Sequence, residues 1–406
     1  MKCKATIGAH WGLAALALFL AAGAAVASGR VETIDFRVLE GTVDSLNDKE
    51  VTILVANEKK AIPLEDLAQI ELGAAADALA AEGQALIVTA GGDQLPARDL
   101  VGREGKLSFS NEMLGRAEMP LSVARALYLP SPGSTARQVQ GKSDPLLPAE
   151  QTQDVLVAKR KDGSLVAVEG IFKAIDAKMI TLNYDGEDRQ TSREMVFAVR
   201  LAAVAEGKDH RAGAIVGIDG SILGFTSAVM DGEFLSADTP SLGRLKIPRK
   251  NVASIRFVSR RLVLLTDLKP AAVTEHGFFD KAFPYQINAT AGGGPLKLGG
   301  RSYSVGLGLH SFCELTYKLE GPFTAFVALA GIDDSARPLG DAKLTFLGDG
   351  KELDKPLRLT GKSDPAPVRL NLTGVKELVI RVEFGEDRLD VGDRVDLVNP
   401  RLIKGL

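Results

Sequence analysis

The chain has 406 residues, of which 25% are charged and 45% hydrophobic, and its formal net charge is −3. This length exceeds one ordinary hydrophobic core and predicts two or three domains. The near-neutral charge balance excludes a strongly basic surface for nucleic acid. The sequence contains only four His and two Cys, and His10 and Cys3 lie close to the start of the chain. These counts exclude a His/Cys metal centre, a CxxC redox site and a disulfide framework.

The segment 1–27 has the features of a secretory signal peptide. Lys2 and Lys4 precede an apolar stretch at 13–26, and a small-x-small sequence ends at Ala27. This short apolar core favours a cleavable signal over the alternative, an uncleaved membrane anchor. Cleavage after Ala27 also removes Trp11, the only tryptophan, and changes the net charge to −5. We therefore expect an exported protein (periplasmic, cell-surface or secreted) without a transmembrane segment.

A degenerate repeat with a unit of ~40 to ~57 residues extends through 31–260. In each copy a Pro, or a Ser in its place, is followed seven positions later by an apolar residue. The pairs are Pro63 and Ile70, Pro120 and Leu127, Ser192 and Val199, and Pro248 and Ile255. Alternating apolar runs and Gly-containing turns before each pair predict short strands. The Pro is expected to open the last strand or a single helical turn.

These repeats predict two small β-domains, at 31–130 and 150–260. A polar, Pro-rich linker at 131–149 is expected between them. The Ala-rich stretch 64–81 is expected to contain a short helix. The repeats hold no catalytic or phosphate-binding motif, so we interpret them as scaffold or spacer, with self-association as a further use. A basic cluster is expected to be a solvated face, and it consists of Lys250, Arg256, Arg260 and Arg261.

The region 262–406 has a different pattern. Short runs with a period of two alternate with frequent turn signals, which predicts an antiparallel β-sandwich. The length suits an eight-stranded jelly roll. The clearest runs are 314–319, 323–329, 343–347, 368–372 and 378–384. The overall prediction is an all-β chain, in which a C-terminal jelly-roll β-sandwich follows two small β-domains.

Five ordered motifs in 262–406 resemble the NPCBM domain, a carbohydrate-binding-module family with a galactose-binding-like jelly-roll fold. They are Leu-x-Asp-Leu at 265–268, Tyr-x-x-Gly-x-Gly-x-His-Ser at 303–311, Gly-Ile-Asp-Asp at 331–334, Asp-Gly-Lys at 349–351, and an ending Asp-x-x-Asp…Pro-Arg-Leu at 393–402. The resemblance implies a secreted bacterial protein that binds glycans, with galactose-containing glycans the expected class. The family commonly has Trp where this chain has Leu397. If that Trp is a core residue, Leu397 replaces it; if it touches sugar, this copy has lost or changed its ligand.

The expected binding site lies on loops at one end of the sandwich, where polar groups surround an aromatic ring. The candidates are Tyr303, His310, Phe312, Asp333, Asp334, Asp393, Asp396, Asn399 and Arg401. Each has a purely structural alternative. His310 could brace its loop, and Tyr303 and Phe312 could belong to the core. Asp333 and Asp334 could bind a structural calcium ion or form Asx-turns. Arg401 could pair with the nearby carboxylates.

One thiol remains after signal cleavage, at Cys313. We interpret it as a small buried hydrophobe in a strand; the alternative is a nucleophile with His310 as its base. Glycoside hydrolysis needs two carboxylates that face each other across a cleft, and no such pair stands out in the sequence. A glycoside hydrolase is therefore the less favoured alternative. We expect a non-catalytic protein that captures polysaccharide weakly and multivalently, with about −4 to −6 kcal/mol per site. The alternatives are a structural or adhesion component of the envelope, or an accessory subunit of a glycoside hydrolase system.

Overall fold

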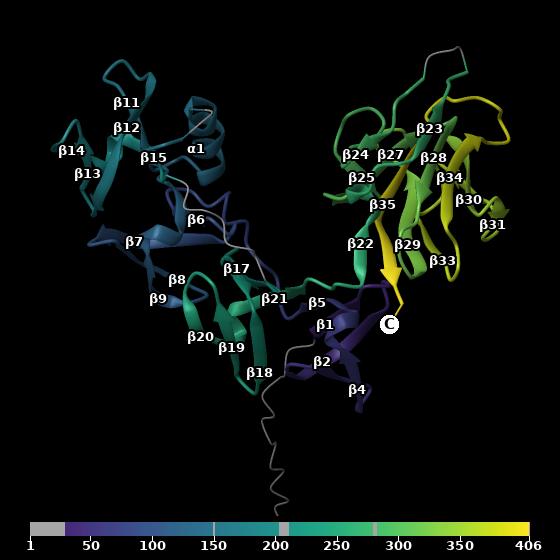
Figure 1. Cartoon of the computed structure of the whole chain (residues 1–406), viewed down its shortest axis with the longest axis horizontal. Coiled ribbons are helices and arrows are strands. Elements are labelled where there is room, and N and C mark those ends of the chain that lie inside the picture. Colours follow the sequence, from purple (N-terminus) through teal and green to yellow (C-terminus); the bar gives the residue numbers. More distant parts are fainter. Residues whose placement is uncertain (1–28, 149–150, 203–210, 279–281, 406) are drawn as a thin grey trace, which may run out of the picture.

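The computed structural model describes residues 29–148, 151–202, 211–278 and 282–405. The signal peptide predicted at 1–27 lies outside these residues. The described chain is built almost entirely of antiparallel strands, which confirms the predicted all-β class. Figure 1 shows two arms: strands β6–β15 form one arm, the C-terminal sandwich forms the other, and the remaining strands of the repeat region lie at the base. In the described residues, no helix has the length and apolar character needed to cross a membrane.

Four successive units in 29–257 share one strand order. The first unit contains β1 (Gly29–Thr33), β2 (Val38–Leu46), β3 (Glu50–Val55), β4 (Glu58–Pro63), the 3₁₀ turn η1 (Leu64–Asp66) and β5 (Leu67–Glu71). The second contains β6 (Ala85–Thr89), β7 (Gln94–Arg103), β8 (Lys106–Asn111), β9 (Gly115–Pro120), η2 (Leu121–Val123) and β10 (Ala124–Tyr128). In each, the first strand pairs with both the second and the last, so the sheet curls round a small core.

The third and fourth units repeat this order. The third contains β11 (Asp154–Lys159), β12 (Leu165–Ile175), β13 (Met179–Tyr184), β14 (Glu187–Ser192), η4 (Arg193–Met195) and β15 (Val196–Arg200). The fourth divides its second strand in two and contains β16 (Gly213–Gly217), β17 (Ile222–Phe225), β18 (Ser227–Asp231), β19 (Phe234–Thr239), β20 (Gly243–Pro248), η5 (Arg249–Asn251) and β21 (Val252–Phe257). Their buried apolar residues join those of the first two units in one cluster.

The Pro of each unit does what the sequence predicts. Pro63, Pro120 and Pro248 each stand directly before a 3₁₀ turn, and Ser192 takes the same place in the third unit. Pro63 has φ −58°, close to the angle that its ring imposes, and a residue with no N–H loses little at a strand end. The Ala-rich stretch 64–81 contains no α-helix: its only helical part is η1, and β5 follows at once.

The apolar residue seven positions after each Pro lies where two units meet. Ile70 of β5 pairs with Ile255 of β21, and Leu127 of β10 pairs with Val199 of β15. All four side chains are fully buried. The first unit is therefore joined to the fourth, and the second to the third. The β5–β21 and β10–β15 ladders satisfy the backbone of strands that would otherwise be open edges.

These ladders cross the boundary between the domains predicted at 31–130 and 150–260. Independent folding of those two domains stays a prediction, but their strands are hydrogen-bonded to each other. The segment predicted as a linker, 131–149, contains α1 (Ala136–Ser143) and η3 (Asp144–Leu146). Thr135 caps α1 in a capping box with Gln138. Ala136 and Val139 of the helix are buried in a cluster with residues of β10 and β15, so this part of the chain packs on the units that it joins.

The C-terminal sandwich consists of two antiparallel sheets. One sheet has the order β24 (Gln286–Ile287), β27 (Gly306–His310), β35 (Arg394–Lys404), β29 (Phe323–Ile332) and β33 (Ala366–Asn371), and β22 (Leu262–Leu264) also pairs with β35. The other has the order β23 (Ala272–Glu275), β28 (Cys313–Lys318), β34 (Glu377–Phe384), β30 (Asp341–Gly348) and β31 (Lys351–Glu352), and β32 (Leu357–Thr360) pairs with β30. A ribbon of β25 (Leu296–Leu298) and β26 (Arg301–Tyr303) completes this part. Alternate inward side chains of both sheets form a separate core.

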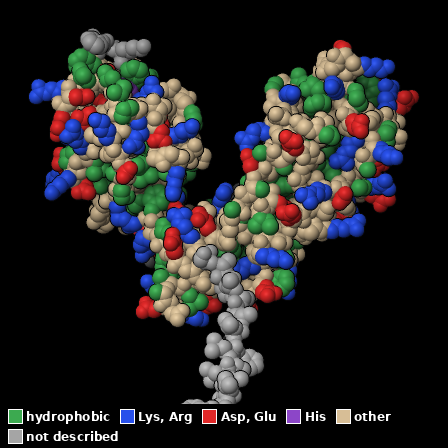
Figure 2. All heavy atoms as spheres, turned by 180° about the vertical axis from the view of Figure 1, so that it is seen from behind, with side chains coloured by type: hydrophobic (Ala, Val, Ile, Leu, Met, Phe, Trp, Pro, Cys, Tyr) green, Lys and Arg blue, Asp and Glu red, His purple; other side chains and the backbone are tan. Residues whose placement is uncertain are grey.

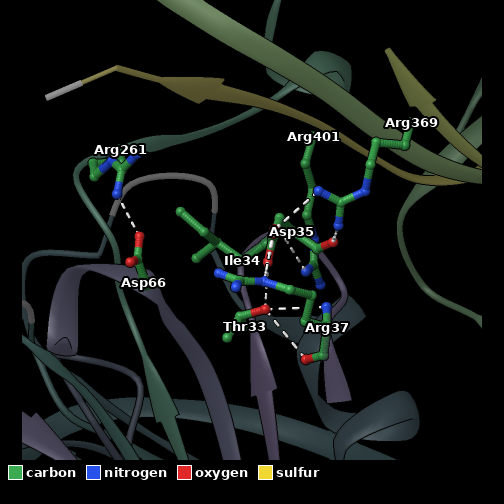
Figure 3. Close-up of polar contacts among 8 residues, drawn as sticks. All are labelled: Thr33, Ile34, Asp35, Arg37, Asp66, Arg261, Arg369 and Arg401. Carbon is green, nitrogen blue, oxygen red and sulfur yellow. Dashed lines mark hydrogen bonds and ion pairs between the residues drawn. The ribbon is translucent and has the colours of Figure 1, made fainter. Parts of the chain in front are cut away.

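The sandwich contacts the first unit through arginines (Figure 3). Arg401 of β35 donates to the carbonyl oxygen of Ile34 at 3.2 Å, and its guanidinium lies 4.0 Å from the ring centroid of Phe36. Arg369 of β33 binds the Asp35 carboxylate at 3.0 Å. Burial opposes ionisation of Asp35, but its hydrogen bonds with Thr33, Arg369 and Arg37 outweigh that effect and hold the pKa at about 2. The contact is therefore charged on both sides throughout the physiological range.

An apolar cluster and a third arginine complete the same contact. Ile34 packs against Val327 and Ile403 of the sandwich, and all three are buried. Arg261 forms an ion pair with Asp66 and donates from Nε to the carbonyl oxygen of Lys404 at 3.0 Å. The expectation that Arg261 belongs to a solvated basic face is therefore wrong, because its side chain is only 20% exposed.

Replacement of Arg401 by Met should loosen the sandwich from the first unit. The variant loses a hydrogen bond from a charged donor and the ion pair with Glu32 at 3.6 Å, a loss of about 1.5–3 kcal/mol. Calorimetry of the full chain should show the sandwich melting several degrees earlier. Arg244→Met is the matched control, because Arg244 is 80% exposed and its ion pair is 3.9 Å long. Equal melting of both variants would contradict this role for Arg401.

Candidate functional site

A pocket of about 410 Å³ opens at one end of the sandwich. It lies where β27 ends and β35 begins, between the loop that follows β29 and the loop that precedes β35. The lining residues are Phe283, His310, Ser335, Ala336, Arg337, Pro338, Leu339, Asp390, Val391, Gly392 and Arg394. This volume is within the usual range for small-molecule sites, and the pocket lies at the loop end where the sequence analysis placed a site.

A stacked pair of rings forms one wall of the pocket. The ring centroids of Phe283 and His310 are 4.3 Å apart, and their planes differ by 28°. His310 is 5% exposed, and its Nδ1 lies 2.9 Å from the carbonyl oxygen of Ser311. Since a carbonyl can only accept, Nδ1 carries the proton and Nε2 of the neutral ring is an acceptor. Burial lowers the pKa of His310, which favours this neutral form.

Polar groups of three types line the rest of the pocket. Arg394 donates from Nη1 to Oγ of Ser335 at 3.2 Å. The Arg337 Nε donates to the carbonyl oxygen of Gly361 at 3.0 Å, which fixes that side chain. Asp390 accepts from the backbone N–H of Phe278 through Oδ2 at 3.1 Å. With the His310 imidazole, the pocket offers guanidinium, hydroxyl and carboxylate groups beside an aromatic ring.

The pocket rim is apolar and exposed. Leu339 is 57% exposed and Val391 is 54% exposed. Single exposed hydrophobic residues are ordinary on a protein surface. Here the two belong to the two loops that frame one opening, so they extend its apolar wall outwards. The pocket therefore suits a ligand with one apolar face and several hydroxyl groups.

Phe312 belongs to a second aromatic group and does not line the pocket. Its ring stacks on His276, with centroids 4.5 Å apart and planes within 8°. The backbones of the same two residues exchange hydrogen bonds. Phe384 lies beside this pair and meets Phe278 edge-on at 6.3 Å. His276 and Phe278 are exposed, so this group forms part of the surface.

The carboxylates of Asp333 and Asp334 hold backbone groups. Asp333 accepts from the N–H of Ser335 at 2.9 Å, which is the Asx-turn alternative, and from the N–H of Lys297 at 3.0 Å. Asp334 accepts from Gly299 and Gly300 at 3.0 and 2.7 Å, in the turn between β25 and β26. Among the residues that the structure describes, no group of three or more His, Cys, Asp or Glu could hold a metal ion. A calcium site at this pair stays a prediction.

Asp393 is a fully buried brace behind the pocket. Its Oδ2 accepts from the Ser311 hydroxyl at 2.6 Å, and its Oδ1 accepts from the N–H of Asp341 at 2.8 Å. Burial raises the pKa of Asp393 to about 6, against the opposing effect of these hydrogen bonds. The carboxylate thus ties Ser311, the neighbour of His310, to the start of β35 at Arg394. Its role here is to position pocket residues.

Asp396 forms a buried carboxyl pair with Asp333. Its side chain is fully buried and lies beside Asp333 and Thr290. Burial raises the pKa of Asp396, and the neighbouring Asp333 carboxylate raises it further. The pKa of Asp333 is lowered: burial opposes this, but the neighbouring Asp396 and the hydrogen bonds from Ser335 and Lys297 outweigh it. Asp396 is therefore protonated at neutral pH beside an ionised Asp333, and neither of its carboxyl oxygens has a hydrogen-bond partner among the described residues.

The other predicted residues lie away from the pocket. Tyr303 packs in a small cluster with Leu296, Leu298 and Val398. Asn399 has φ +49° where the register of β35 against β29 shifts, and its N–H donates to the carbonyl oxygen of Val305 at 3.0 Å. Arg401 pairs with Glu32 of the first unit rather than with Asp393 or Asp396. Of the nine candidates only His310 lines the pocket.

Leu397 and Cys313 are core residues. Leu397 is fully buried in the core of the sandwich, where it pairs with Leu307 and Ala330 across the strands. It is not among the residues that line the pocket at the end of the sandwich. Cys313 is 1% exposed, which confirms the interpretation as a buried hydrophobe. Burial raises the pKa of its thiol well above the ordinary value, and the nearby Glu275 raises it further, which opposes a role as nucleophile.

Five polar or aromatic pocket residues were not among the candidates: Phe283, Ser335, Arg337, Asp390 and Arg394. Phe283 belongs to an aromatic-rich stretch of the sequence, 278–285, but nothing in that stretch distinguishes it from its neighbours. Arg394 stands between Asp393 and Val395 in the Asp-x-x-Asp motif. The signal that could have identified Arg394 is the alternation of side chains along an extended chain. Because Asp393, just before β35, is buried, the next side chain is expected to point to the opposite face.

Comparisons with known proteins agree on the sandwich. A family model described as the NPCBM/NEW2 domain matches residues 261–403. A protein of Renibacterium salmoninarum named "Putative endo-alpha-N-acetylgalactosaminidase" is 35% identical over 94 residues, which are 23% of this chain and 6% of that protein. The chain thus spans about 6% of the length of this curated relative.

Solved structures with lower identity also match. A CBM51 module of a family GH95 protein from Clostridium perfringens, in complex with methyl-galactose, is 22% identical with a TM-score of 0.32, and the match covers 35% of this chain and 99% of that one. Tandem CBM51 modules of a family 98 glycoside hydrolase from Streptococcus pneumoniae are 15% identical with a TM-score of 0.31, covering 62% and 88%.

Asp396→Asn should remove an alkaline destabilisation. In the unfolded chain an Asp carboxyl titrates near 3.9, whereas the folded pKa of Asp396 is raised, so the folded state binds the proton more tightly. The stabilisation from this group is therefore complete at acid pH and is lost as the pH rises towards the raised pKa. Melting temperatures of the wild type should fall by several degrees between pH 6 and 10. The Asn variant has no titratable group at this position, so its melting temperature should fall less.

Asp349→Asn is the matched control for this titration. Asp349 is exposed at a turn, and the substitution makes the same Asp-to-Asn change. Its melting profile should follow that of the wild type. A wild-type profile that is flat over this pH range, or an Asp396→Asn profile parallel to it, would contradict the protonation of buried Asp396.

Proposed function

Residues 261–403 form an NPCBM/NEW2 domain, a carbohydrate-binding-module type, and on this premise we propose that the chain is an exported, non-catalytic protein that binds glycans. The proposed site is the pocket lined by Phe283, His310 and Arg394. The repeat units carry this domain as a scaffold. The partner is a polysaccharide or glycoconjugate, with no nucleic acid involved.

The stacked Phe283–His310 wall is the observation that carries the proposal. A hexose has an apolar face of C–H groups and an edge of hydroxyl groups. The Phe283 ring offers a surface for the C–H face. Nε2 of His310 and the Oδ1 side of Asp390 accept from hydroxyl groups, while Arg394 and Ser335 donate to them. The pocket of about 410 Å³ holds one terminal sugar residue rather than a long chain.

The sugar that we propose is galactose or N-acetylgalactosamine. The curated relative, at 35% identity over 94 residues, is named as an endo-alpha-N-acetylgalactosaminidase. In such sugars the C4 hydroxyl is axial and points to one face of the ring. The opposite face therefore presents only C–H groups from C3 to C5. That face matches a single flat ring better than a slot between two rings. Weak affinity, about −4 to −6 kcal/mol, is expected for one such site.

The acidic groups of the pocket support binding rather than hydrolysis. Both classes of glycosidase require a pair of carboxyl groups across the bond that is cleaved. Among the described residues that line the pocket, Asp390 is the one carboxylate. Asp333, Asp393 and Asp396 are buried behind it and engaged with backbone groups, Ser311 or each other.

Surface charge supports a glycan over a polyanion as partner. Figure 2 shows Lys and Arg interspersed with Asp and Glu over both lobes of the face in view. A polyphosphate partner calls for a contiguous basic surface. The net charge of −3 also disfavours a polyanionic partner. Export rests on the sequence of residues 1–27 and is part of the proposal.

Arg394→Met and Phe283→Ala should each weaken glycan binding at least ten-fold. The first removes the guanidinium donor and the second removes the apolar wall, whereas neither residue belongs to the core cluster. The measurement is a glycan array with the full chain, with and without calcium, followed by titration of methyl-galactoside and N-acetylgalactosamine. Arg401→Met, measured at a temperature at which its sandwich stays folded, is the control, because Arg401 lies at the contact with the first unit.

Three outcomes would overturn the proposal. Glycan binding that survives both pocket substitutions would place the sugar elsewhere. A folded chain that binds no glycan would favour the structural or adhesion alternative, in which the sandwich contacts protein. Loss of binding in Arg401→Met with normal binding in Arg394→Met would move the site to the contact with the first unit.

A further inference from the structure

A second pocket lies in the repeat region, between the first and fourth units. Its volume is about 930 Å³, roughly twice that of the pocket in the sandwich. Residues of β2 and β3 line one side, and the β18–β19 turn and the η5 turn line the other. Four large apolar residues of its lining are not fully buried: Leu54, Leu72, Ile218 and Phe234. The glycan proposal makes no use of this space.

Arg249, the first residue of η5, brings a charge to this apolar space. Its Nη2 is buried, and among the residues that the structure describes it has no hydrogen-bond partner. Burial lowers the pKa of Arg249, with an opposing effect from Asp44, but a guanidinium stays charged at neutral pH. The Asp44 carboxylate is engaged with Nζ of Lys59 at 2.9 Å. An unpaired buried donor of this kind costs free energy unless something else accepts from it.

The repeat supplies an internal comparison for Arg249. The equivalent residue of the third unit, one position after Ser192, is Arg193. Nη1 of Arg193 donates to the carbonyl oxygens of Leu100 and Asp176, at 3.2 and 3.0 Å. Leu100 belongs to the neighbouring second unit and Asp176 to the β12–β13 turn. At the junction of the second and third units, the arginine therefore has protein partners on both sides.

The junction of the fourth and first units is built by the same kind of strand pairing, but the surroundings of its arginine differ. Here β18 pairs with β2 at Met230 and Leu46, as β12 pairs with β7 at Ile175 and Gly102. Arg249 lines the junction as its counterpart in the third unit does, but its buried Nη2 has no carbonyl partner among the described residues, and its side chain borders an open pocket. One junction is thus closed by protein, and the other is left with a cation and an apolar cavity.

We propose that this second pocket binds a small aliphatic carboxylate, with its carboxylate on Arg249 and its hydrocarbon chain against Leu54, Leu72, Ile218 and Phe234. A guanidinium pairs with a carboxylate through two parallel hydrogen bonds. A singly charged group fits better than a phosphate, because the Asp44 and Glu233 carboxylates in the lining balance the charges of Arg249 and Lys250. A hydrocarbon chain needs no polar partners in this lining, whereas the amides of a bound peptide would.

Titration of the full chain with decanoate tests the proposal. We expect one site per chain, a melting temperature that rises with decanoate concentration, and no comparable effect of decyltrimethylammonium, which has the opposite charge. Arg249→Met should weaken decanoate binding at least ten-fold. Arg193→Met is the matched control at the other junction and should bind decanoate as the wild type does.

Unliganded stability separates a ligand-binding role of Arg249 from a structural one. Arg193→Met removes two hydrogen bonds to carbonyl groups and should melt several degrees below the wild type. Arg249→Met removes no hydrogen bond that the structure shows for its side chain, so its melting temperature should equal or exceed that of the wild type. A fall like that of Arg193→Met would make Arg249 a structural residue and overturn the proposal.

The remaining outcomes also decide the matter. Equal binding of decanoate by the wild type and Arg249→Met, or binding of decyltrimethylammonium as tight as that of decanoate, would show apolar adsorption without recognition of the carboxylate. Binding of the peptide acetyl-Gly-Val-Leu-Leu through its free carboxylate, without binding of decanoate, would make the occupant a peptide C-terminus. Each of these results would overturn the proposal, and none depends on glycan binding by the sandwich.

Discussion

The pairing of β35 with strands on both sides is the interaction on which the C-terminal half depends. This strand runs from Arg394 to Lys404 and is hydrogen-bonded to β27 along its first half and to β29 along most of its length. Its first residue lines the pocket at the end of the sandwich, whereas Arg401 and Ile403 near its end bind the first unit. One rigid strand therefore connects the proposed ligand site with the contact that fixes the sandwich to the rest of the molecule. The pocket is held by the sheet and by the Asp393 brace, so the domain needs little rearrangement to receive a sugar.

The repeat units meet a different requirement. A five-stranded unit with one small core has exposed edges, and the β5–β21 and β10–β15 ladders cover them. Because the first unit pairs with the last, the chain returns to its start before the sandwich begins. This arrangement explains why the sandwich contacts the first unit through Asp35 and Asp66, although three further units separate that unit from β22 in the sequence. It also brings Arg249 of the fourth unit against β2 of the first, which creates a cavity that no single unit possesses.

Local patterns in the sequence predicted the fold well where the chemistry itself is local. The Pro before each 3₁₀ turn, the period of two in the sandwich strands and the burial of Cys313 follow from backbone and side-chain preferences of neighbouring residues. The spacing of seven from Pro63 to Ile70 was visible, but its meaning was not, because the partner Ile255 belongs to the last unit of the repeat region. Pairing between distant units leaves no mark in any one window of sequence. For the same reason the sequence predicts Arg261 to be a surface charge and Arg401 to be a ligand-binding group. The structure shows instead that both pair with residues of the first unit.

The site shows the same limit more sharply. The sequence pointed to loops that frame the pocket, but it chose residues by their chemistry, and the strongest hydrogen-bonding groups of those loops are engaged with other parts of the protein. Asp333 and Asp334 hold four backbone N–H groups, and Asp393 holds a hydroxyl and an N–H. Such carboxylates are valuable to a loop because each satisfies donors that would otherwise lie buried without partners. The residues left to face a ligand are those beside them, Ser335 and Arg394, which the braces hold in place. Where aspartates fix the loops of a domain, the residues free to contact a ligand are therefore the sequence neighbours of those aspartates. A motif of this kind is better evidence for where a site lies than for which of its residues binds.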